Sequence, residues 1–143
     1  MLESTIKSTL TGDLQTTALN FASFLSENNL TFKDGAVRHQ DKVICYMHLD
    51  NGEEMPSPWT IWTEGDYSSE PASAPLTQHT KETAQANVNI CASCGGSCNP
   101  GQQKVIFGKT FENVCSADMA FYRPSAETLE CIKHLLLMRK NND

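Results

Sequence analysis

The chain has few positive charges and no long apolar run. It carries 11 Lys and Arg against 17 Asp and Glu, which gives a net charge of −6 and a pI near 5.1. Nucleic-acid-binding proteins normally present a basic face to the phosphates, so DNA or RNA binding is disfavoured. No apolar segment approaches the roughly 20 residues that span a bilayer, and the first residues lack the basic and apolar regions of a secretory signal. We therefore expect a cytoplasmic protein with no membrane segment.

Recognisable catalytic motifs are also missing from the sequence. There is no serine in a nucleophile elbow, no glycine-rich phosphate loop after a strand and no His-Glu metalloprotease motif. The acidic residues of Glu53-Glu54 and Glu64-Gly65-Asp66 fall in expected loops, without a partner for acid–base chemistry. The pattern predicts no catalytic residues and favours a module that binds a small molecule or a protein over an enzyme.

Cysteine, by contrast, is concentrated in one place. Three of the six cysteines lie in Cys91-Ala-Ser-Cys94-Gly-Gly-Ser-Cys98. Thiolate sulfur is a ligand for zinc and for iron–sulfur clusters, and the Cys-x-x-Cys spacing lets two thiolates bind one tetrahedral ion. The two glycines let the chain turn Cys98 back toward the same centre. The sequence therefore predicts a cysteine loop over residues 91–101 that holds a structural Zn²⁺ ion.

A closed zinc site needs a fourth ligand, for which the sequence offers several candidates. Cys115 is the first choice, because it follows Cys98 by 17 residues across one expected strand, as in split zinc ribbons. His79 on the preceding helix is the second. Cys131 and His134, three residues apart on the last helix, are the third. Cys45 lies in an apolar strand and is assigned to the core.

Two other chemistries remain open for the same loop. Cys94, Cys98 and the following Pro100 resemble the end of a bacterial ferredoxin cluster-binding run, which makes an iron–sulfur cluster the second possibility. Cys91 and Cys94 have the spacing of a redox dithiol pair, so a thiol-redox or metal-responsive sensor or enzyme is the third.

Periodicity predicts one α+β domain over residues 1–143, built on an antiparallel β meander with helices at both ends. Strand patterns precede and follow the strong turn signal of Asp50-Asn51-Gly52. The polar segment 64–76 is expected to be a mobile loop. Helices are expected at 14–28 with Asp13 as N-cap, from Thr77 to 88 and from 124 to 140, with a weaker one at 3–9, and strands at 36–40, 43–49, 59–63, 104–107 and 119–122.

Three residues of the expected meander form a possible ligand pocket. Tyr46 and His48 alternate onto one face of their strand, and Trp62 on the next strand is expected to lie nearby. The alternative is that these residues belong to a core face that ends in a half-exposed histidine.

The order of elements resembles that of small uncharacterised bacterial α+β domains of the YjbR, TfoX N-terminal and YdhG type. The segments Ile106–Lys109, Phe111–Cys115 and Phe121–Pro124 are similar to a pattern found in small bacterial proteins. The resemblance implies an early helix, a meander and a closing helix. It implies no particular activity, and the cysteine loop is not part of it.

Overall fold

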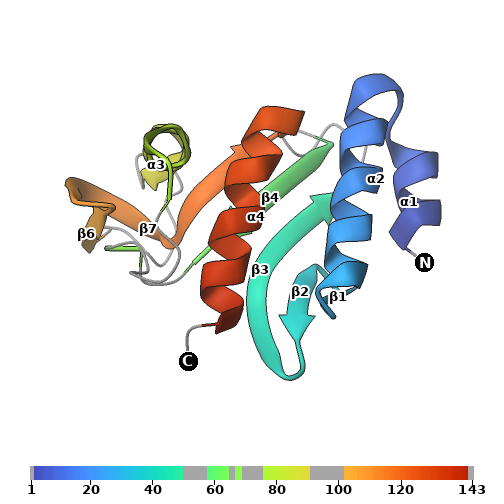
Figure 1. Ribbon diagram of the computed structural model, residues 1–143, viewed down its shortest axis with the longest axis horizontal. Helices are drawn as coiled ribbons and strands as arrows, with labels where there is room; N and C mark the ends of the chain where they lie inside the picture. The colour runs from blue at the N-terminus through green and yellow to red at the C-terminus, as the bar shows by residue number, and fades with distance from the viewer. Residues whose placement is uncertain (1, 50–57, 65–66, 69–75, 91–101, 142–143) are drawn as a thin grey trace.

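The computed structural model describes residues 2–49, 58–64, 67–68, 76–90 and 102–141. Within these ranges the chain is α+β and forms one antiparallel sheet with four helices (Figure 1). The elements are α1 (Leu2–Thr9), α2 (Gly12–Glu27), β1 (Thr31–Lys33), β2 (Ala36–His39), β3 (Lys42–Leu49), β4 (Trp59–Thr63), α3 (Gln78–Ala86), β5 (Val88–Ile90), β6 (Gln102–Ile106), β7 (Lys109–Tyr122) and α4 (Ala126–Asn141).

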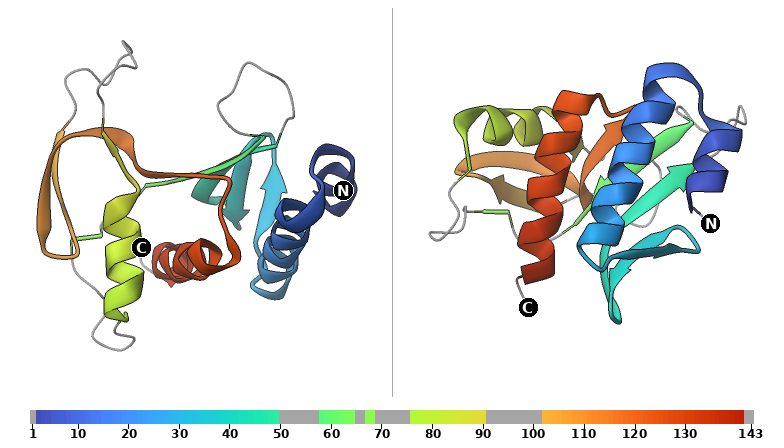
Figure 2. Two further views of the ribbon diagram at one scale, coloured as in Figure 1. Left: turned by 90° about the horizontal axis from the view of Figure 1, so that it is seen from above. Right: turned by 45° about the vertical axis from the view of Figure 1, so that its right-hand side comes forward.

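The sheet has the strand order β1-β2-β3-β4-β7-β5, and β6 also pairs with β7. Every pairing among the described strands is antiparallel. Figure 2 shows α2, α3 and α4 on the same face of the sheet, with α1 packed beside α2. The sheet therefore has one face covered by these helices and one turned away from them.

The helices are amphipathic, and their apolar stripes form the core. Ala18, Phe21 and Leu25 of α2 are buried, and the ring of Phe21 lies 6.1 Å from that of Trp59 on β4. Because side chains alternate along a strand, Trp59, Ile61 and Thr63 share the helix side of β4, whereas Thr60 and Trp62 share the opposite side. On α4 the buried stripe consists of Leu129, Ile132, Leu135 and Leu136, and Met138 is partly buried beside it.

The β meander, the short first helix and the closing helix agree with the sequence predictions, but several boundaries differ. Thr11, not Asp13, is the N-cap residue of α2, and Asp13 lies within the first turn. Helix α3 ends at Ala86, short of the expected residue 88, and Val88 begins a strand that was not predicted. β1 was also not predicted.

The largest difference concerns the last strand, which was expected to cover only 119–122. The observed strand β7 runs for 14 residues and pairs with β4, β5 and β6. It bends visibly (Figures 1 and 2), and the register against β6 shifts between Gln102 and Lys104. Asn113 has φ of 60° at this shift, a conformation that asparagine tolerates better than most residues.

Candidate functional site

The two ends of the predicted cysteine loop lie on opposite edges of strand β7. Ile90, the last residue of β5, pairs with Val114, and Gln102, the first residue of β6, pairs with the same valine from the other side. Cys115 is the next residue along β7 and is 9% exposed. The strand that carries the preferred fourth ligand is therefore flanked by both ends of the loop, whereas Cys91, Cys94 and Cys98 themselves lie outside the described residues.

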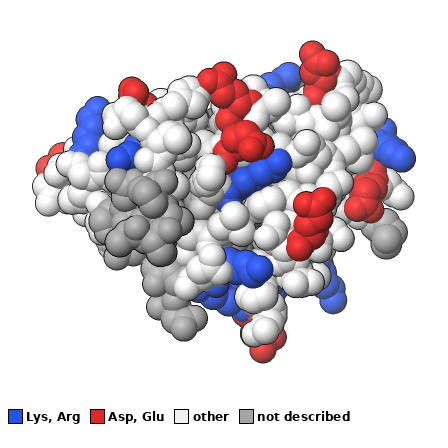
Figure 3. Space-filling model, viewed as in Figure 1, with Lys and Arg blue, Asp and Glu red and all other residues white. Residues whose placement is uncertain are grey.

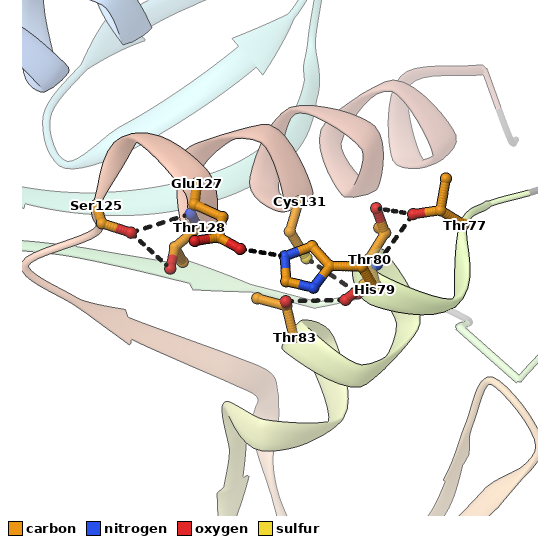
Figure 4. Close-up of polar contacts among 8 residues, drawn as sticks. All are labelled: Thr77, His79, Thr80, Thr83, Ser125, Glu127, Thr128 and Cys131. Atoms are coloured by element: carbon orange, nitrogen blue, oxygen red, sulfur yellow. Dashed lines mark hydrogen bonds and ion pairs between the residues drawn. The ribbon is translucent and has the colours of Figure 1, made fainter.

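The remaining cysteines of the described ranges are core residues. Cys45 on β3 is completely buried, as predicted from its apolar strand. Cys131 on α4 is 2% exposed, and its thiol donates a hydrogen bond to the Thr80 carbonyl at 3.4 Å (Figure 4). Burial raises the pKa of Cys131 to about 12, so this sulfur stays a thiol at neutral pH.

The histidine alternatives for a fourth ligand lie on exposed surfaces. The side chain of His79 is 63% exposed, and its Nε2 lies 2.6 Å from Oε1 of Glu127 across the α3–α4 contact (Figure 4). His134 is exposed although Cys131, three residues earlier, is buried, so these two candidates do not share a surface. Among the described residues, no three His, Cys, Asp or Glu side chains converge as a metal site would require.

The three predicted pocket residues lie on the sheet face turned away from the helices. Tyr46 is directly opposite Trp62, and His48 is directly opposite Thr60. Thr60 is in turn opposite Tyr122 on β7. Tyr46 and Tyr122 are 39% and 50% exposed, whereas Trp62 and His48 are half-buried. The structure thus brings Tyr46, His48 and Trp62 onto one surface and adds Thr60 and Tyr122 to it.

This surface contains two buried polar atoms for which the described part of the chain supplies no hydrogen-bond partner. They are Nε2 of His48 and Oγ1 of Thr60, and Thr60 as a residue is 0% exposed. Leaving a buried polar atom unpaired costs about 1–3 kcal/mol, so a hydrogen-bonding partner at either atom would be stabilising. Sequence reasoning missed Thr60, although its position between Trp59 and Ile61 already places it on the face opposite to theirs.

A second polar cluster lies where β7 bends. Asp118 is fully buried and forms an ion pair with Lys104 of β6. Tyr67 is 2% exposed, and its pKa is raised, chiefly by burial and next by the negative charge of Asp118. The sequence prediction placed Tyr67 in a polar loop. Its aromatic side chain was the one sequence signal that this residue packs into the core.

A shallow groove of about 240 Å³ separates α2 from α4 on the helix face. Lys133 lies in it, 2.7 Å from Oδ1 of Asn20, 3.0 Å from Oε2 of Glu130 and 5.7 Å from the ring centre of Phe24. Its ammonium group is therefore already well coordinated. Figure 3 shows acidic and basic side chains interspersed on this face, without a large patch of either sign.

Within the described ranges, no helix has the length and apolar character that crossing a membrane requires. Comparisons of this chain with known protein families, with curated proteins and with solved structures gave no match.

Proposed function

We propose that this protein is a non-enzymatic binding module in which the cysteine loop of residues 91–101 and Cys115 hold a structural Zn²⁺ ion. The observation that supports this assignment is the double pairing of Val114 with Ile90 and Gln102. It places both ends of the loop beside the residue that precedes Cys115. Ligands that are distant in the sequence can reach one ion only if the fold brings their chain segments together, and this strand pairing does so.

Four thiolates would complete a tetrahedral site and leave no position for water or substrate. Such an ion stabilises the fold and does not take part in catalysis. The ion would hold the connection between β5 and β6 against β7. This connection, residues 91–101, is rich in glycine and serine and has few apolar side chains that could be buried, so the metal would supply stability that packing does not. The reducing cytoplasm that the sequence favours would keep the thiols available for the metal.

The test is elemental analysis of protein purified without a metal-affinity tag. We expect one zinc ion per chain, and we expect Cys115→Ala to lose it. Cys45→Ala is the matched control, because it removes another buried cysteine of the same sheet and should keep the metal. A chelator should lower the thermal midpoint of the wild type and of Cys45→Ala, but not that of Cys115→Ala.

Wild-type protein without bound zinc, with the thiols of Cys91, Cys94 and Cys98 freely titratable, would refute the metal site. Zinc retained at full occupancy by Cys115→Ala would instead refute the fourth ligand alone. A subsequent His79→Ala variant would then show whether the histidine on α3 holds the ion.

A further inference from the structure

We infer that the sheet face formed by Tyr46, His48, Thr60, Trp62 and Tyr122 binds a neutral, planar heteroaromatic small molecule with a hydrogen-bond donor and an acceptor on one edge. This inference rests on the proposed role as a binding module and names its ligand class. The ligand site is separate from the metal site, since none of these five residues belongs to the proposed zinc ligands.

The first argument is the arrangement of the aromatic rings. Tyr46 and Trp62 are cross-strand neighbours on β3 and β4, and Tyr122 lies on the third strand, β7. Neighbouring strands are about 4.8 Å apart, and residues two apart on a strand are separated by about 7 Å. The five side chains therefore occupy an area comparable to a fused two- or three-ring compound. Tyr46 and Tyr122 expose much of their surface on a face that the described helices do not cover.

The second argument is the pair of unpartnered polar atoms. His48 and Thr60 face each other across β3 and β4, and the buried Nε2 and Oγ1 atoms have no hydrogen-bond partner among the described residues. A hydroxyl group both donates and accepts, and a neutral imidazole nitrogen does one or the other. Because both atoms are covered in the free protein, a ligand reaches them only when the side chains above them turn aside. The amide-like edge of a heteroaromatic ring presents a donor next to an acceptor, and can then satisfy both atoms while the ring stacks on Trp62 or Tyr46.

The third argument concerns charge. None of the five side chains carries a permanent charge, and the chain as a whole has a net charge of −6. An anionic or phosphorylated ligand would gain no ion pair from these side chains and would be repelled by the overall charge. Stacking of bases on exposed sheet aromatics also occurs in RNA recognition, but that requires a basic surface for the phosphates. A free, uncharged ring compound fits this face better.

The test uses riboflavin and guanosine as probes, because both are uncharged and carry a donor and an acceptor on one ring edge. Binding is followed by two-dimensional ¹H–¹⁵N NMR of the two tryptophan indoles. We expect saturable shifts of the Trp62 signal with at least one probe. The signal of Trp59, which is 0% exposed on the opposite face, should move little.

Three variants test whether the side chains of Thr60 and Trp62 contribute to probe affinity. Thr60→Val should weaken probe affinity about tenfold, which is the effect of one lost hydrogen bond in a buried site. Trp62→Leu should weaken it by between about 5-fold and 100-fold through lost stacking. Thr63→Val is the matched control, because Thr63 is equally buried on the same strand but on the helix side, and affinity should not change. Thr60→Val should also keep or raise the thermal midpoint, since no described residue bonds to the Thr60 hydroxyl.

No shift of the Trp62 signal with guanosine at about 1 mM, a concentration that detects even weak binding, or with riboflavin at its solubility limit, would overturn the inference. Equal affinities of the wild type and Thr60→Val would overturn it as well. Zinc content measured on the same samples separates this outcome from failure of the metal site. Absent probe binding with zinc retained refutes the ligand site, whereas probe binding without zinc refutes the metal.

Discussion

At the scale of single residues, the ion pairs of this protein differ in their surroundings. Asp118 is 1% exposed at its side chain and pairs with Lys104, which is 24% exposed. His79 and Glu127 form a pair in which both side chains are largely exposed. Exposed pairs contribute little to stability, whereas a buried carboxylate depends on its cation because it has lost most of its hydration. The Lys104–Asp118 pair should therefore matter much more than the His79–Glu127 pair.

We predict that Lys104→Met lowers the free energy of unfolding by about 1–3 kcal/mol. Methionine keeps most of the apolar stem but leaves the Asp118 carboxylate without the ammonium group. We expect a smaller loss of unfolding free energy than for a fully buried ion pair, because Lys104 is partly hydrated. Urea unfolding at pH 7 measures the change. Lys33→Met, at an exposed position on β1, is the control and should cost less than about 0.5 kcal/mol. Equal effects of the two variants would contradict the prediction.

At the scale of elements, the helix starts differ in how their backbone amides are satisfied. Oγ1 of Thr77 accepts a hydrogen bond from the Thr80 amide at the start of α3, at 3.1 Å. Ser125 accepts one from the Thr128 amide before α4, also at 3.1 Å. Thr11 precedes α2 in the same extended conformation but makes no side-chain cap hydrogen bond. The same residue type is thus a functional cap at one helix and not at another.

This difference gives a matched pair of substitutions. Thr77→Ala should lower the free energy of unfolding by about 1 kcal/mol, because it leaves an amide of the first turn without its acceptor. Thr11→Ala should lower it by only a few tenths of a kcal/mol, since no such bond is lost. Chemical denaturation of the two variants and the wild type measures both changes. A larger cost for Thr11→Ala would show that the cap geometry does not determine these energies.

At the scale of the whole molecule, the core protects groups that ionise at high pH. Burial raises the pKa values of Cys45, Tyr67 and Cys131 above their ordinary values. The folded protein therefore keeps these groups neutral where the unfolded chain would ionise them. Their contribution to stability is complete below the pKa of the unfolded state, near 9 for a thiol, and is lost as pH rises toward the folded value.

We predict that the stability of the wild type falls more steeply with pH than that of Cys131→Ala between pH 9 and about 11. One ionisable thiol accounts for up to about 1.4 kcal/mol per pH unit, which sets the expected difference in slope. Urea unfolding in the presence of a reductant measures it. Cys131→Ala will also be less stable at pH 7 through lost packing, so the slopes are compared and not the absolute values. Parallel slopes would mean that Cys131 ionises equally in both states.

The fold and the candidate site were predictable to different degrees. Helix α4 was predictable because Leu129, Ile132 and Leu135 repeat at helical spacing. The β2–β3 hairpin was predictable from its apolar and aromatic run, although its turn lies at Gln40-Asp41, because Lys42 already pairs with His39. Strand β7 was only partly predictable, because Glu112 and Asn113 interrupt the apolar pattern where the strand bulges and bends. The backbone conformation at Phe107 was not predictable either. Its φ of 49° is unfavourable for an aromatic residue, and its amide donates a hydrogen bond to the carbonyl of Tyr67, which is distant in the sequence, at 2.7 Å.

The sequence by itself determined the helix and strand periodicities, the strand face that Tyr46 and His48 share, and the clustering of three cysteines. These are local properties, since each depends on residues close together in the chain. Only the tertiary structure decided that Ile90 and Gln102 flank Val114, that Thr60 completes the aromatic face, and that Asp118 is buried against Lys104. Each of these contacts joins separate elements, and their geometry follows from how the whole chain packs its apolar surface.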